Sequence, residues 1–254
     1  MEVLPITRSI WEGQRAALVI THPGHELLVH GWLEKTRPLV FVLTSGNGSA
    51  IGTTAQIVQR AGARIGSIFG RCTDRGLRTA LLMKEKHRFN SFAQELADAF
   101  VNESIDLVVG DSAEGFDPAH DLCRVIVDAA VGIAAQTRPE IKNFEFPLVG
   151  GLIARSTALK QRVEGEAWIR KFAHCRAYAE PIEEIQRRLA NDGLDALREE
   201  HVRLATPWAI RNRRDVLYTR VEDGRIPAIQ FSDHVLPVAG SVHRYVSGRH
   251  AWAA

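Results

Sequence analysis

Three histidines stand where the sequence indicates that strands end and helices begin. His22 and His25 follow an apolar run at residues 16–20, and His120 follows an apolar run at residues 105–109 and its loop. Imidazole nitrogens are common zinc ligands, and three protein ligands with a fourth position open to water are typical of a catalytic zinc site. The sequence therefore predicts one divalent metal ion, zinc (Zn2+), held by His22, His25 and His120.

The elements that would position these histidines form an alternating pattern. Apolar, strand-length runs occupy residues 16–20, 39–43, 64–69, 105–109 and 141–146, and amphipathic helical patterns such as residues 87–102 and 118–134 lie between them. Strands that are apolar on both faces are typical of a parallel sheet covered by helices. We predict an α/β, Rossmann-like, mainly parallel sheet with helices on both faces and a mostly helical C-terminal extension. The first and fourth runs should be neighbours, and the more polar fifth run should lie nearer an edge.

Nearby carboxylates offer routes for a proton. Asp117, Glu114 and Glu26 lie closest in sequence to the three histidines, and we take Asp117 as the first catalytic candidate. An Asp directly before a Pro also caps a helix, so the capping role stays open for Asp117. Glu26 is the second catalytic candidate, with a structural role inside the first helix as its alternative.

The character of the chain changes after residue 150. Residues 159–205 are mostly helical in pattern, and residues 216–246 combine short strand-like pieces with turns at Asp223-Gly224 and Pro237. We divide the chain into a Rossmann-like α/β core with the metal site at residues 1–150 and an extension packed on it at residues 151–254. The two are expected to form one structural domain.

Composition excludes several classes of partner. The formal net charge is only +2 from 32 basic and 30 acidic residues, and the sequence has no basic run, so we expect no nucleic-acid partner. The apolar runs are too short for a membrane span. The three separated cysteines indicate reduced thiols, and the N-terminus lacks a signal-peptide pattern, so we expect a cytoplasmic protein. Homo-oligomerisation is left open.

Several segments resemble the PIG-L/LmbE-like family of zinc-dependent N-deacetylases. The segment containing His22 and His25 reads THPGHELLVHGWL and resembles the first family motif, usually His-Pro-Asp-Asp-Glu. The segment containing His120 reads FDPAHDLCRVIVDAAV and resembles another, usually His-Pro-Asp-His. Between and after them come VFVLTSGNGSA, FGRCTDRG, KNFEFPL and AWIRKFAHCRAY in the order of the family. The resemblance covers roughly residues 15–180 and extends to the FSDHVLPV segment.

The resemblance implies roles by position. His22 and His120 match the family's zinc histidines, and His25 occupies the place of its zinc-binding aspartate. Gly24 stands where the family has its general base, which glycine cannot replace. Asp117 stands where a histidine assists the oxyanion or the leaving amine. Further substitutions and contacts follow in the same way: Ala119 replaces a supporting carboxylate, and Arg71 and Asp74, with Glu114, would contact a polar substrate.

The function implied is zinc-dependent removal of an acetyl group from an N-acetylated sugar or glycoconjugate. Gly24 leaves a second interpretation open, a non-catalytic family member that binds metal or sugar. A third interpretation is nucleotide binding, because the glycine-containing loop Ser45-Gly46-Asn47-Gly48 precedes a helix and could accept a phosphate.

Overall fold

A computed structural model describes most of the chain. It covers residue 11 and residues 13–149, 157–180, 182–206, 217–218 and 229–250. The turn expected at Asp223-Gly224 lies outside the described residues.

The centre of the fold is a sheet of seven strands among the described residues, in the order β3-β2-β1-β4-β5-β7-β6. Its strands are β1 (Ala16–Ile20), β2 (Leu39–Thr44), β3 (Arg64–Cys72), β4 (Leu107–Asp111), β5 (Lys142–Phe146), β6 (Thr157–Arg162) and β7 (Glu199–Leu204). The first five strands in this order, β3, β2, β1, β4 and β5, run parallel to one another, and β1 pairs with both β2 and β4. This order confirms the predicted Rossmann-like fold with β1 central and beside β4.

The C-terminal region is mostly helical over residues 159–205, as predicted, and it also adds two strands to the sheet. β7 pairs antiparallel with β5, and β6 pairs antiparallel with β7. The prediction that the polar run at 141–146 lies near an edge was wrong, because β5 has β4 on one side and β7 on the other. Glu145 of β5 is polar yet buried, because its carboxylate pairs with Arg203 of β7: Oε1 of Glu145 lies 2.9 Å from Nε of Arg203.

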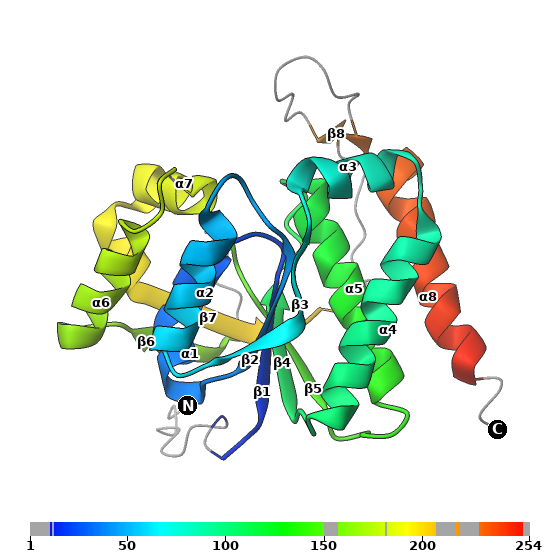
Figure 1. The fold of residues 1–254 in the computed structure, drawn as a ribbon, viewed down its shortest axis with the longest axis horizontal. Helices are drawn as coiled ribbons and strands as arrows, with labels where there is room; N and C mark the ends of the chain where they lie inside the picture. The colour runs from blue at the N-terminus through cyan, green and yellow to red at the C-terminus, as the bar shows by residue number, and fades with distance from the viewer. Residues whose placement is uncertain are drawn as a thin grey trace, which may run out of the picture.

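Helices cover both faces of the sheet (Figure 1). The helices on one face are α3 (Asp74–Leu82), α4 (Lys86–Asn102), α5 (Pro118–Ala134) and α8 (Leu236–His250). The helices on the other face are α1 (His30–Thr36), α2 (Ala50–Arg60), α6 (Gly165–Cys175) and α7 (Glu183–Asp192). The described residues also include short helical turns of other types: η1 (His25–Val29), η2 (Leu194–Arg198) and the π-helical η4 (Phe231–Val235). Every residue of β1 is buried, as expected for a strand between two helical layers.

The described end of the chain is more helical than its sequence pattern indicated. A two-stranded sheet joins β8 (Leu217–Tyr218) to β9 (Ile229–Gln230), and α8 then runs from Leu236. Pro237, expected in a turn, is the second residue of α8, which continues directly from the π-helical η4. None of the helices in the described ranges is both long and apolar enough to cross a lipid bilayer.

Candidate metal centre

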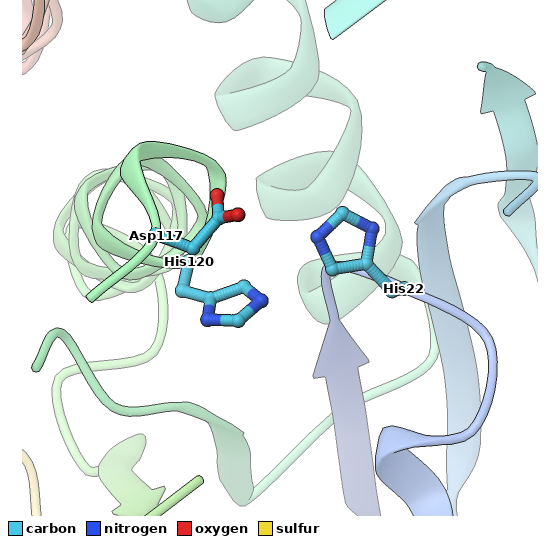
Figure 2. A group of neighbouring side chains, drawn as sticks. All are labelled: His22, Asp117 and His120. Atoms are coloured by element: carbon cyan, nitrogen blue, oxygen red, sulfur yellow. The ribbon is translucent and has the colours of Figure 1, made fainter. Parts of the chain in front are cut away.

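The three predicted histidines meet at the carboxyl ends of β1 and β4. His22 follows β1 by two residues, His25 opens η1, and His120 lies in the first turn of α5. The ring centroids are 5.4 Å apart for His22 and His25, 5.1 Å for His22 and His120, and 4.9 Å for His25 and His120. Figure 2 shows His22 facing Asp117 and His120 across the rim. The sheet thus brings together residues almost 100 positions apart.

His25 is fully buried and oriented by Asp111. Its Nδ1 lies 2.9 Å from Oδ2 of Asp111, which also accepts hydrogen bonds from the backbone N–H and the hydroxyl of Thr21. Burial lowers the pKa of His25, but the carboxylates of Asp111 and Glu184 outweigh it, so the net pKa is raised well above its usual value. A carboxylate on Nδ1 presents Nε2 as the free nitrogen, the arrangement common to metal-binding histidines.

His22 has a similar partner in Asp74. Its Nδ1 lies 2.8 Å from Oδ1 of Asp74 and 2.9 Å from the hydroxyl of Thr44, which donates to the carbonyl of Thr21. Burial opposes ionisation of Asp74, yet its contact with His22 holds the net pKa down at about 2. The structure places Asp74 against His22, where it fixes the orientation of the ring, and the predicted contact of Asp74 with a substrate stays a prediction.

His120 is buried and neutral at neutral pH. Burial lowers the pKa of this histidine to about 4, against the opposing effect of Asp117. Its Nε2 has no hydrogen-bond partner, and the same holds for Nε2 of His25. A buried polar atom without a partner is costly, so two such nitrogens side by side indicate a ligand that they share. These nitrogens fit a divalent metal ion, because His120 is already neutral and an ion that binds His25 displaces its proton.

Two overlapping groups of side chains in the described residues could hold an ion. One consists of His22, Asp117 and His120, and the other of His25, His120 and Glu184, with the ligand atoms of each group within 4.8 Å of one another. Glu184 belongs to α7 and is buried. No sequence signal pointed to it, because it lies far along the chain and outside the segments that resemble a motif.

Asp117 caps α5 and also belongs to the site. Its Oδ1 accepts the N–H of Ala119 at 2.7 Å, and its Oδ2 accepts from Nη2 of Arg78 at 2.6 Å. Burial opposes ionisation of Asp117, but His120, His22 and Arg78 outweigh it and lower its pKa. The predicted cap is present, and the catalytic role stays a prediction.

Glu26 supports the loop that carries the histidines. Its Oε2 accepts the N–H of Gly24 at 2.8 Å, and its Oε1 accepts the hydroxyl of Tyr178, which also contacts Thr54. Burial raises the pKa of Glu26, although the Tyr178 hydroxyl acts in the opposite direction. These contacts agree with the structural alternative for Glu26 that the sequence left open.

Arg71 and Glu114 have partners away from the histidines. Arg71 donates to the carbonyl of Ser67 and to Glu95 on α4, and it is largely exposed. Glu114 accepts the N–H groups of Leu148 and Val149 at 2.9 Å and thereby positions that loop. Their predicted contact with a substrate stays a prediction.

Gly24 has no room for a side chain. Its φ is 101°, and a Cβ built there would lie 2.4 Å from Cδ1 of Ile182, two residues before Glu184. The chain segment that leads into α7 therefore occupies the space beside Gly24. The position matched to the family's general base is closed by the C-terminal region.

Comparisons with known proteins give distant structural likenesses. No family model matches the sequence, and no curated protein matches it. The conserved protein TT1542 from Thermus thermophilus is 17% identical, with 76% of this chain and 95% of that chain covered and a TM-score of 0.49. A triple mutant of a deacetylase of the teicoplanin biosynthetic pathway is 13% identical, with 75% and 97% covered and a TM-score of 0.49. The zinc-inhibited form of teicoplanin deacetylase Orf2 is 12% identical, with 71% and 90% covered and a TM-score of 0.43.

Proposed function

We propose that the chain is a zinc-dependent amide hydrolase that removes the acetyl group from an N-acetylated sugar or glycoconjugate. The observation that carries the metal is the pair of buried Nε2 atoms on His25 and His120 that have no hydrogen-bond partner, beside a third histidine. The motif resemblance around His22 and His120 supports the choice of an acetamide substrate.

In this proposal His22, His25 and His120 hold the ion. A divalent ion at that place supplies Lewis acidity toward an acyl oxygen and toward water. Asp74 and Asp111 keep the Nδ1 atoms of His22 and His25 occupied, so that the Nε2 atoms stay available. Neither of the two ligand-capable groups contains both His22 and His25, so binding by all three histidines requires a small movement of their side chains.

Asp117 is the carboxylate that we assign to proton transfer. It lies in one ligand-capable group with His22 and His120, and Glu26 lies in neither of the two groups. Each carboxylate oxygen has two acceptor positions, so Asp117 can orient a donor in addition to Arg78 and the N–H of Ala119. Oδ2 can then take a proton from the attacking water and pass it to the departing amine, which leaves poorly as an anion.

An Asp117→Asn variant tests this assignment. Asparagine also caps helices well, so the fold and the bound metal should be retained. Turnover of N-acetylated amino sugars by zinc-loaded protein should fall by roughly 10²–10⁴-fold, the usual contribution of a general acid or base. The measurements are steady-state kinetics, metal content by elemental analysis and a thermal melt.

Arg78→Gln is the matched control, because it breaks the same ion pair but keeps the carboxylate. Its loss of turnover should be much smaller than that of Asp117→Asn. Full activity in metal-loaded Asp117→Asn would place the proton route elsewhere. Metal-loaded wild-type protein that hydrolyses no member of a broad panel of acetylated amino sugars would instead favour a non-catalytic binding protein.

A further inference from the structure

Glu184 lies between the two histidines whose Nε2 atoms have no hydrogen-bond partner. Its Oε2 is 3.5 Å from Nε2 of His25, and its Oε1 is 3.6 Å from Nε2 of His120. All three side chains are buried, with exposed fractions of 0%, 2% and 5% for His25, His120 and Glu184. One carboxylate thus faces both free nitrogens at nearly equal distance.

These distances distinguish direct hydrogen bonds from the ligation of one shared metal ion. A hydrogen bond between nitrogen and oxygen spans about 2.7–3.2 Å, so both contacts are too long. Ligand atoms that each lie about 2.0–2.1 Å from a tetrahedral zinc ion are about 3.4 Å from one another. The two separations therefore match neighbouring ligands of one ion better than they match direct pairing.

The position of Glu184 is held by its neighbours on α7. Ile185 packs in the core, and Arg188 one turn later donates to the carbonyls of Leu148 and Pro147. Ile182 fills the space beside Gly24. The helix is therefore anchored on both sides of Glu184, and its carboxylate is directed at the histidines without a flexible linker.

We propose that Glu184 is a ligand of the metal ion together with His25 and His120, an inference that rests on the proposed function. The C-terminal region then contributes directly to the metal centre: Glu184 takes the place that the three-histidine site gives to His22, and the fourth position of a tetrahedral ion stays open. A carboxylate ligand also cancels one of the two positive charges of the ion, which three neutral imidazoles would leave in full. Binding of the ion must in turn stabilise α7 against the sheet.

Metal affinity tests the proposal independently of catalysis. Zn2+ is titrated into apo protein against a competing chelator for wild type, Glu184→Gln and Glu184→Asp, with circular dichroism and thermal melts to verify folding. Both variants should bind Zn2+ at least about 10-fold more weakly, because Gln lacks the charge and Asp is one methylene too short to reach the ion. Glu183→Gln, the same change one residue earlier, should bind like wild type.

Hydrogen exchange of α7 supplies a second readout. Added Zn2+ should slow amide exchange over residues 183–192 in wild type and in Glu183→Gln, but not in Glu184→Gln. Wild-type affinity in folded Glu184→Gln would overturn the ligand role and leave the proposed metal site intact. Loss in Glu184→Gln with full affinity in Glu184→Asp would also overturn it, because charge without contact would then suffice. Folded wild-type protein that binds no metal would overturn the proposed function itself.

Discussion

Two aspartates orient two of the three histidine rings in the candidate metal centre. Asp111 and Asp74 each accept from one Nδ1, on His25 and His22 respectively. Asp111 is the last residue of β4, so the strand that sets the position of the site also supplies the group that orients a ligand. The residue types were visible in the sequence, but their pairing depends on β1 and β4 being neighbours.

Gly24→Asp is the residue-scale prediction, because it restores a carboxylate where the resembling family has one. A side chain at φ 101° is strained by about 1–3 kcal/mol, and its Cβ would meet Ile182 at 2.4 Å. Overpacking of a filled site adds about 1–3 kcal/mol. We expect the free energy of unfolding, measured by urea denaturation, to fall by at least about 2 kcal/mol.

Ile182→Ala separates the two causes. In that background Gly24→Asp should cost less, because the clash is relieved and only the backbone strain remains. If Gly24→Asp is as stable as wild type, the steric argument for this glycine fails. The segment before α7 would then not be what prevents a carboxylate at position 24.

At the scale of elements, α1 and α6 are joined by a pair of buried imidazoles. Nε2 of His30 on α1 lies 2.8 Å from Nδ1 of His174 on α6. Burial lowers the pKa of His30 to about 4, and the nearby His174 acts in the same direction. His30 therefore takes up a proton at a lower pH in the folded chain than in the unfolded chain.

The consequence is a loss of stability in mild acid. Between pH 6.5 and about 4 the unfolded state binds a proton at His30 that the folded state does not, so stability falls as pH falls through that window. In His30→Gln the fall should be smaller by up to about 3 kcal/mol, from a shift of about 2.5 pH units. Urea denaturation at several pH values measures the difference.

His243→Gln, at an exposed position of α8, is the control for this pH profile. It should leave the dependence of stability on pH as it is in wild type. A profile of His30→Gln that runs parallel to wild type would show that His30 takes up its proton equally in the folded and unfolded states.

On the scale of the whole molecule, the C-terminal region is integrated into the sheet. β7 pairs with β5, and Glu200 of β7 accepts from the N–H groups of Gly31 and Trp32 at the start of α1 and from Lys171 of α6. Tyr178, Ile182 and Glu184 all contact residues of the first half. These contacts support the proposal that residues 1–150 and 151–254 form one structural domain.

A single unfolding transition is the expected result. Amides of β1 and β7 should exchange with the same free energy of opening, because breaking the β5–β7 pairing exposes the buried Glu145 and Glu200. Hydrogen exchange under native conditions measures both strands at once. Early exchange of β7 while β1 stays protected would instead indicate two units, in line with the division at residue 150.

Much of the first half was predictable because its signals are local. The helix predicted at residues 118–134 has those bounds in the structure, since Asp117 and Pro118 form a cap and first turn whose physics acts within a few residues. The apolar runs identified β1, β2 and β4, because a strand buried on both faces must be apolar throughout. Strand order then followed from the usual topology of such sheets.

The sequence by itself determined the helices and strands whose apolar patterns and caps lie within their own residues. It also placed the three histidines after β1 and β4. Only the tertiary structure decided that the polar β5 is interior, that β7 lies beside it, and that Glu184 faces His25 and His120. Glu145 and Glu184 look like surface residues in sequence, because their partners lie 58 residues away or more along the chain. The local spacing of apolar residues indicates which segments form helices or strands and which of their faces are buried. The pairing of distant polar groups depends instead on how segments far apart in the sequence pack together on the sheet.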